Sequence, residues 1–165
     1  MPAGARRAWR RSACRRPNWW RRSARFWSIR QRTFAAPPKG AEAMAILALD
    51  HVQLAMPAGR EDEARAFYGG LLGFAEQAKP ANLAARGGCW FSRGSIKLHL
   101  GVEQDFRPAK KAHPAFLVDD MVALRKTLET AGYHVVEDEP LEGYHRFYVH
   151  DPFGNRIEMM QPLEP

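Results

Sequence analysis

Three histidines and one glutamate occupy matching places in two halves of the chain. His51 and His113 each lie in the first strand-like run of their half, and His99 and Glu158 each lie in the last such run. Two or three imidazoles together with one carboxylate suit a divalent first-row metal ion and leave coordination positions open for a substrate. We therefore predict a metal site formed by His51, His99, His113 and Glu158.

Such a site would act electrostatically on its substrate. A divalent ion chelated by two neighbouring substrate oxygens stabilises an enediolate, alkoxide or related oxyanion as charge develops. His99 and Glu158 are the catalytic candidates, because an imidazole or a carboxylate outside the coordination shell can act as general base. Arg146 and Tyr148, which alternation places on one strand face, and Gln53 are predicted to bind substrate. The alternative for the first two is a surface arginine and a half-buried tyrosine.

The elements that must position these residues follow an order that occurs twice. His51 and His113 are 62 residues apart, Gly73 and Gly132 are 59 apart, and Gly94 and Gly154 are 60 apart. A period of this length, over strand, helix and three strands, indicates two pseudo-symmetric modules. A strand–helix–strand order alone would also fit a parallel α/β sheet. Hairpin-like turns late in each half favour mixed sheets with helices on one side instead.

The individual elements are predicted from periodicity and from their end signals. In the first half we expect a strand at 49–56, a helix at 61–72 ended by Gly73, and strands near 74, at 89–91 and at 96–102. In the second half we expect a strand at 113–118, a helix from Met121 capped by Asp119-Asp120, and strands at 133–137, 146–150 and 156–161. Alternation within 96–102 places His99 on the polar face of its strand.

Three segments carry a resemblance to a known family. They are Asp50-His51-Val52-Gln53-Leu54, Ala112-His113-Pro114-Ala115-Phe116, and the run from Phe147 to Glu158 with its Asp-Pro-x-Gly-Asn-x-Ile-Glu turn. They resemble the vicinal oxygen chelate superfamily, which includes glyoxalase I, fosfomycin-resistance thiol transferases, extradiol dioxygenases and bleomycin-resistance proteins. The resemblance covers residues 47–161 and implies an α+β fold in which modules 47–103 and 112–161 form a curved, cup-like mixed sheet.

The resemblance also has implications for the site. It implies that His51, His113 and Glu158 are metal ligands, whereas glyoxalase I usually has a glutamate where this chain has His99. That departure weakens the specific glyoxalase assignment without excluding a metal. A homodimer is expected, and exchange of modules between chains in many relatives allows one site to draw its ligands from two subunits.

We therefore expect a metal-dependent enzyme of glyoxalase-like type that acts on a small substrate with adjacent oxygens. A lyase, a thiol transferase and a dioxygenase are all compatible with this expectation, and the ion could be Fe, Mn, Ni, Zn or Co. The alternative is a metal-free protein that binds and sequesters a small molecule, as bleomycin-resistance relatives do.

The N-terminal region differs from the rest in charge. Residues 1–43 contain eleven arginines, Lys39 and a single acid, Glu42, which gives them a net charge of +11. The whole chain has a net charge of +7, so the domain at 44–165 has a net charge of −4. We interpret 1–43 as a disordered tail or an over-extended start, with Met44 as a natural first residue. Its arginines and tryptophans leave open nucleic-acid or anionic-membrane binding and a transit peptide. An export signal is the weakest alternative, because no apolar stretch follows the twin arginines.

Composition limits the remaining functional classes. The chain is 45% hydrophobic and 26% charged, which is typical of a globular protein. No apolar run approaches the roughly 20 residues that span a bilayer, and two cysteines are too few for a disulfide framework. We expect a cytoplasmic protein whose folded domain binds neither nucleic acid nor membrane.

Overall fold

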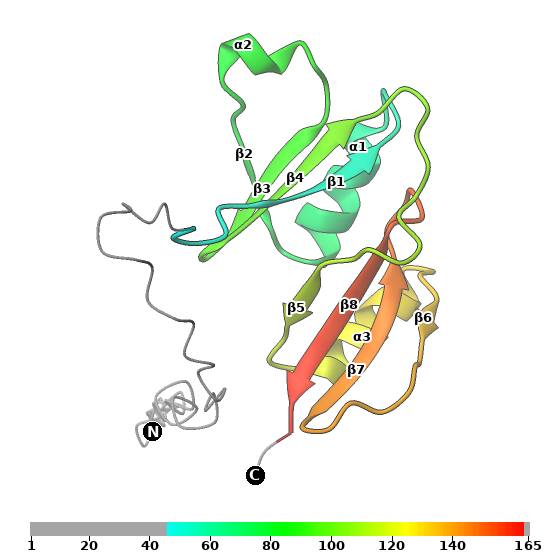
Figure 1. Cartoon of the computed structure of the whole chain (residues 1–165). Helices are drawn as coiled ribbons and strands as arrows, with labels where there is room; N and C mark the ends of the chain where they lie inside the picture. Colours follow the sequence, from blue (N-terminus) through cyan, green and yellow to red (C-terminus); the bar gives the residue numbers. More distant parts are fainter. Residues whose placement is uncertain (1–45, 164–165) are drawn as a thin grey trace, which may run out of the picture. The chain divides into compact units, whose positions relative to one another are not determined.

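The computed structural model describes residues 46–163, so the tail predicted at 1–43 lies outside the described part of the chain. Residues 47–163 form one compact unit that contains two four-stranded sheets and their helices (Figure 1). In the part of the chain that is described, none of the helices has the length and apolar character that crossing a membrane would require.

The first sheet has its strands in the order β1-β4-β3-β2. These strands are β1 (Val52–Met56), β2 (Ala75–Gln77), β3 (Cys89–Arg93) and β4 (Ile96–Val102). β1 is parallel to β4, whereas β3 is antiparallel to both β4 and β2. Between β1 and β2 the chain forms α1 (Glu61–Ala64), which continues into the π-helix η3 (Arg65–Leu71), and α2 (Ala81–Ala84) precedes β3.

The second sheet repeats this topology in the order β5-β8-β7-β6. Its elements are β5 (Ala115–Leu117), α3 (Met121–Thr130), β6 (Val135–Val136), β7 (Tyr144–His150) and β8 (Arg156–Pro162). Again the first strand, β5, is parallel to the last, β8, and the remaining pairs are antiparallel. The prediction of an α+β fold with two βαβββ modules is confirmed.

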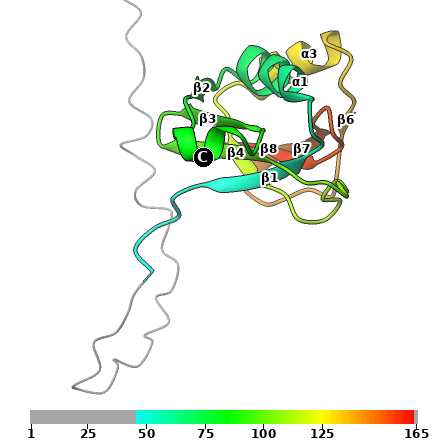
Figure 2. The same ribbon diagram turned by 90° about the horizontal axis from the view of Figure 1, so that it is seen from above.

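Each sheet buries one face and leaves the other polar. Figure 2 shows α1 and α3 on the same side of the strands. Phe67 and Tyr68 of η3 are fully buried, as is Leu128 of α3, and they join a core made of the apolar strand positions. In β4, Leu98 and Leu100 are buried as alternation predicts. The polar faces of β4 and β8 are therefore the faces free to bind a ligand.

A turn between β7 and β8 connects the two modules. Asp151 Oδ2 accepts hydrogen bonds from the hydroxyl of Tyr68 and from Nδ2 of Asn155, both at 2.8 Å, and Asn155 Nδ2 also donates to the carbonyl oxygen of Ala55 at 2.8 Å. Asp151 and Asn155 are 4% and 1% exposed. Burial raises the pKa of the Asp151 carboxyl group, although the hydrogen bonds it accepts oppose that rise.

Several local predictions differ from the structure. His51 immediately precedes β1, and His113 lies two residues before β5, so neither is inside the strand in which we expected it. The helix predicted at 61–72 changes from α to π geometry at Arg65, and the amide of Leu72 donates to the carbonyl of Phe67 five residues earlier. The helix α2 was not predicted, because four residues are too few to show a periodicity.

Candidate functional site

The strand register gives His99 and Glu158 equivalent positions in the two sheets. His99 lies beside Gln53 of β1 and Trp90 of β3. Glu158 likewise lies beside Ala115 of β5 and Tyr148 of β7. Each candidate therefore projects from the polar face of the strand that follows its module's hairpin, next to an aromatic residue of the neighbouring antiparallel strand.

In the first module, His51, His99 and Trp90 form a stack of three rings. The ring centroids of His51 and His99 are 4.2 Å apart with an interplanar angle of 23°. Trp90 covers the other side of His99, with centroids 4.3 Å apart and an angle of 6°. Burial, and then the nearby His51, lower the pKa of His99 below its ordinary value of 6.5. His99 is thus held as a neutral ring at neutral pH.

Asp50, which is itself bound by Lys97, holds the Nδ1 edge of the His51 ring. Nδ1 of His51 donates to Oδ2 of Asp50 at 3.0 Å, and Nζ of Lys97 donates to Oδ1 of the same carboxylate at 2.6 Å. The hydrogen bond from Lys97, followed by that from His51, lowers the pKa of Asp50. With its Nδ1 proton committed, a neutral His51 presents Nε2 as a free ligand atom, an arrangement common behind metal-binding histidines.

The stack does not allow His51 and His99 to hold one ion together. An imidazole binds a metal through a lone pair that lies in the plane of the ring, at about 2.0–2.1 Å. Two stacked planes inclined by only 23° do not meet within that distance of both nitrogens. One of the two rings would have to turn out of the stack before both could be ligands.

In the second module, His113 and Glu158 form a separate pair. Nε2 of His113 lies 3.3 Å from Oε2 of Glu158. Nδ1 of His113 donates to the carbonyl oxygen of Lys111 at 2.7 Å. Because Nδ1 already carries a proton, Nε2 meets the carboxylate in one of two ways: as the donor of a hydrogen bond when the ring is doubly protonated, or as a lone pair that needs a cation between the two atoms.

Arg146 anchors the other oxygen of Glu158. Its Nη1 donates to Glu158 Oε1 at 2.9 Å and to the hydroxyl of Tyr148 at 2.6 Å. Burial alone would raise the pKa of Glu158, but the hydrogen bonds from Arg146 and His113 outweigh it and hold the pKa below 4.5. Glu158 is therefore a carboxylate at neutral pH, and Arg146 positions it.

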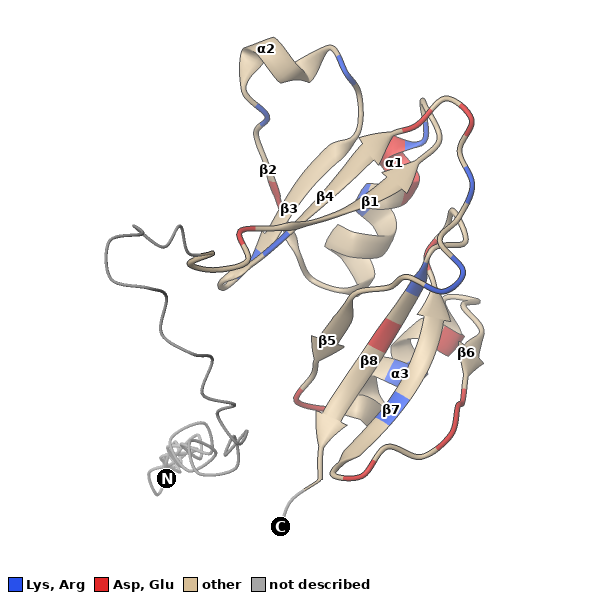
Figure 3. Ribbon diagram, viewed as in Figure 1, with Lys and Arg blue, Asp and Glu red and all other residues tan. Residues whose placement is uncertain are grey.

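The four predicted ligands thus come together as two pairs rather than as one cluster. Among residues 46–163 no group of three or more His, Cys, Asp or Glu side chains is placed to hold a metal ion. Figure 3 shows acidic and basic segments close together on β7 and β8. The structure brings His113 to Glu158, and His51 to His99, within one chain.

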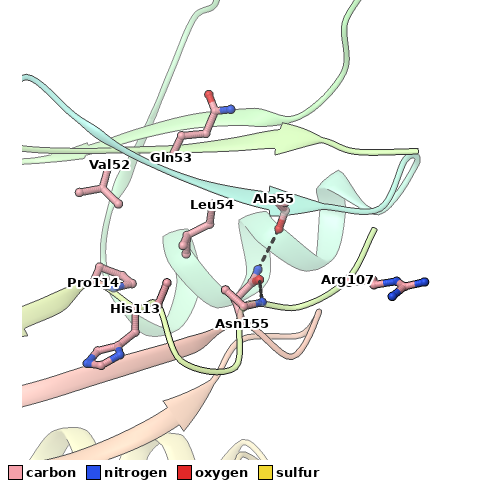
Figure 4. A pocket seen from close by; sticks show the side chains of 10 residues that line it. Val52, Gln53, Leu54, Ala55, Arg107, His113, Pro114 and Asn155 are labelled. Carbon is pink, nitrogen blue, oxygen red and sulfur yellow. Dashed lines mark hydrogen bonds between the residues drawn. The ribbon is translucent and has the colours of Figure 1, made fainter. Parts of the chain in front are cut away.

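A pocket of about 310 Å³ lies along the free edge of β1. Figure 4 shows Leu54 and Asn155 directed into this space, whereas the ring of His113 points toward the second sheet and away from β1. Gln53 extends away from the pocket, on the face of the sheet that carries His99. The remaining lining residues are Val52, Ala55, Arg107, Ala109, Ala112 and Pro114.

Gln53 lies over a glycine of the neighbouring strand. A Cβ atom built on Gly101 would lie 2.7 Å from Nε2 of Gln53, so the absence of a side chain at Gly101 gives the amide its place on the sheet. This puts a neutral donor and acceptor next to His99, where a small polar ligand could use it.

The sequence left several residues of these faces unidentified. The sequence analysis assigns no role to Trp90, Asp50, Lys97, Lys111 or Arg156. The strand alternation around His99 and Glu158 could have identified Lys97 and Arg156, which lie two residues before them. The hydrogen-bond partners of Nδ1 in His51 and His113 depend on the conformation of the preceding loops, which a periodic sequence pattern does not predict.

The sequence profile of the Glyoxalase/Bleomycin resistance protein/Dioxygenase superfamily matches residues 48–159. The chain belongs to this superfamily. The matched range contains both candidate pairs, and the resemblance inferred from the three sequence segments is confirmed. Members of the superfamily commonly use divalent metal ions, generally bind small molecules and form dimers.

Solved structures share the fold of this chain. A putative glyoxalase family protein from Bacillus anthracis is 50% identical, with a TM-score of 0.69 over 72% of this chain and 98% of that one. TnmS3, an antibiotic-binding protein from Streptomyces sp. CB03234, is 22% identical, with a TM-score of 0.57 over 73% and 100%. The fosfomycin resistance protein FosX from Listeria monocytogenes is 14% identical, with a TM-score of 0.59 over 72% and 96%. A comparison with curated proteins finds no match.

Proposed function

We propose that the chain is a divalent-metal-dependent enzyme that acts on a small substrate with two adjacent oxygens. In this proposal His113 and Glu158 hold the ion from one subunit and His51 holds it from the other. The observation that supports it most directly is the approach of His113 Nε2 to Glu158 Oε2 at 3.3 Å. Two atoms bound to one ion at about 2.0–2.2 Å are separated by roughly this distance.

The chemistry of the His113 and Glu158 pair fits a cation between them. A lone pair on Nε2 facing a carboxylate is unfavourable unless a proton or a metal ion lies between the two atoms. The bond from Nδ1 to the carbonyl of Lys111 fixes the tautomer that leaves Nε2 free. Arg146 keeps Oε1 of Glu158 occupied, so Oε2 is the oxygen available to the ion.

A second subunit would supply the missing ligand. β1 and β5 are both edge strands, and edge strands with free backbone groups pair readily with another chain. Leu49, just before β1, and Leu117 of β5 are 81% and 65% exposed, which leaves apolar surface for a partner to cover. Pairing of β1 with β5 of a second copy would bring His51 toward His113 of that copy.

Different residues of the chain would have different roles in such a site. A bound divalent ion would stabilise the negative charge that develops on the substrate oxygens. Glu158 and His51 hold their ligand atoms in fixed directions through Arg146 and Asp50. His99, neutral at neutral pH, is the candidate general base. A glyoxalase-like lyase is our choice among lyase, thiol transferase and dioxygenase, with Fe, Mn, Ni, Zn or Co as the ion, in a cytoplasmic homodimer.

Complementation between two defective variants tests the shared site. We would purify His51→Ala and Glu158→Gln separately, then co-express them with different affinity tags and isolate the mixed dimer. Each single variant should lose its metal, because every site in its homodimer lacks one ligand. The mixed dimer should regain one ion per two chains, because one of its two sites contains only intact residues. Metal content by mass spectrometry is the measurement.

A matched variant guards against general effects on the fold. His145→Gln removes an exposed histidine of β7 that lies outside both pairs, and it should retain the metal content of the unmodified protein. A mixed dimer that binds no metal, although the unmodified protein binds one ion per chain, would show that the site does not cross between subunits. Unmodified protein that binds no stoichiometric ion would exclude metal-dependent function altogether.

The second candidate is a metal-free protein that binds and sequesters a small molecule. The stack of His51, His99 and Trp90 favours it, because planar rings already packed together resemble a wall of a ligand pocket more than a set of ligands. Such a protein should contain no stoichiometric metal, and removal of divalent ions should leave its ligand affinity unchanged.

A further inference from the structure

Arg156 is a largely buried cation with little hydrogen bonding of its own. It lies on β8 two residues before Glu158, and alternation puts both side chains on the polar face. Its side chain is 18% exposed, and its guanidinium carbon lies 3.5 Å from the ring centroid of Tyr148. Within residues 46–163 its only side-chain hydrogen bond is a long one, 3.5 Å, to Oδ2 of Asp138. A guanidinium has five N–H donors, so most of its capacity is unused.

Arg146, the arginine predicted from the sequence to bind substrate, uses most of its donors in hydrogen bonds within the protein. It donates to Glu158, to the hydroxyl of Tyr148 and, through Nε at 3.1 Å, to the carbonyl oxygen of Glu139. Its donors are therefore committed to holding the site together. The arginine with donors to spare is Arg156.

Asp138 occupies the space in front of both arginines. Its Oδ2 lies 3.4 Å from Nη2 of Arg146 and 3.5 Å from Nη2 of Arg156. It belongs to the loop between β6 and β7, and its side chain is 41% exposed. Both ion pairs are long and Asp138 itself is substantially exposed, so a competing anion can displace it.

We propose that Arg156 is the anion-binding residue of the ligand site and that Asp138 fills its place until a ligand arrives. The ligand would then be a small molecule that carries a carboxylate or a phosphate-type oxyanion. Exchange of Asp138 for such a group conserves the charge balance, because Arg146 and Arg156 remain opposed by Glu158 and one further anion. The inference extends the proposed function by naming its substrate class, and it rests on that proposal only for the identity of the binding face.

Binding of simple oxyanions to the full-length protein tests this inference. Inorganic phosphate and acetate would be titrated into metal-stripped protein at low ionic strength, and the arginine Nε–H resonances would be followed by NMR. Asp138→Asn removes the internal competitor and should lower the Kd of at least one probe about fivefold. Arg156→Gln should raise that Kd at least about tenfold, because a charge-assisted hydrogen bond is lost. The probe that binds more tightly identifies the substituent.

Glu137→Gln is the matched control. Glu137 is the preceding residue of the same loop and pairs with Arg125 of α3, so the substitution removes the same charge without touching Arg156. If Asp138→Asn binds both probes no more tightly than Glu137→Gln does, the exchange does not occur. Unchanged affinity in a folded Arg156→Gln variant would equally overturn the assignment. Because no metal is present, either result is independent of the metal proposal.

Discussion

Nε2 of His113 lies 3.3 Å from Oε2 of Glu158, across 45 residues of sequence. The linker that carries His113 reaches β8 through its backbone, because the amide of Glu158 donates to the carbonyl oxygen of Pro114 at 3.0 Å. The position of this imidazole is therefore set by the pairing of the linker with β8. In the proposed function, this candidate ligand pair has main-chain support on one side and Arg146 on the other, so it would be held in place before any ion binds.

Arg146→Gln should raise the pKa of Glu158 toward its ordinary value of 4.5, because burial would then be opposed only by His113. Since folding lowers this pKa, Glu158 stabilises the fold above pH 4.5, and that contribution is lost as the pH falls through the folded value. The acid-side loss of stability should be smaller in Arg146→Gln than in the unmodified protein.

Urea unfolding between pH 3 and pH 6 measures this difference, and carboxyl resonances give the pKa directly. Arg125→Gln, which removes an arginine that pairs with Glu137 and Glu129, is the control for general charge effects. A carboxyl resonance of Glu158 that titrates at the same pH in both proteins would contradict the role assigned to Arg146.

His99 should titrate below 6.5, because burial and then His51 disfavour its charged form. His51→Gln removes the neighbouring imidazole and should raise the pKa of His99, while burial keeps that pKa below 6.5. Trp90→Ala uncovers one face of the His99 ring, so it should raise the pKa of His99 by reducing its burial. Imidazole resonances followed by NMR from pH 5 to pH 8 test both, with His145→Gln as a variant outside the stack.

The sign of the linked stability effect follows from the same shift. Because folding lowers the pKa of a base, the contribution of His99 is present above pH 6.5 and is lost as the pH falls through the folded value. A pKa of His99 that is unchanged in both His51→Gln and Trp90→Ala would mean that the stack does not persist in solution.

Asn155→Ala should destabilise the protein by about 2–5 kcal/mol. The substitution removes hydrogen bonds from three polar groups, namely the carbonyl of Ala55, Oδ2 of Asp151, which keeps only the hydroxyl of Tyr68, and the amide of Ala109. Asn155 is 1% exposed, so water does not readily replace the lost bonds. Asn82→Ala, on the exposed surface of α2, should change the free energy of unfolding by less than about 0.5 kcal/mol. Equal stability of the two variants would show that the hydrogen bonds of Asn155 between the modules do not stabilise the fold.

Gly88→Ala should be much more destabilising than Gly59→Ala. Both glycines have a positive φ, 77° and 74°, so both substitutions carry the same backbone strain of about 1–3 kcal/mol. A Cβ at Gly88 would also collide with the carbonyl oxygen of Leu100, whereas nothing lies within 4 Å at Gly59. Thermal unfolding compares the two, and a similar loss in each would show that the first sheet can adjust around Gly88.

The repeated modules could be predicted because their signals are local and periodic. Alternation in β4 identified Leu98 and Leu100 as buried, and Asp120 caps α3 through the amide of Ala123 as its type and place indicated. The offset between His51 and His113 reflects a real equivalence of position, since the register gives His99 and Glu158 matching neighbours.

The pairing of side chains could not be predicted from the same signals. Whether His51 faces His99 or His113 depends on how the two modules are arranged, which a repeat does not specify. The stack on Trp90 depends on the antiparallel register of β3 with β4, set by the hairpin at Gly94. Arg156 could not be predicted because it occupies a variable position of the Asp-Pro-x-Gly-Asn-x-Ile-Glu turn, to which the resemblance assigns no role.

The turn from Asp151 to Asn155 has a consequence for how relatives of this chain are recognised. Its buried polar groups fasten one half of the protein to the other through Tyr68 and Ala55, and none of them belongs to either candidate ligand pair. A sequence motif built on this turn therefore identifies proteins with this fold but does not indicate which reaction they catalyse. Relatives with different chemistry can therefore share this turn, and under the proposed function they would differ at the positions of His51, His113, Arg156 and Glu158.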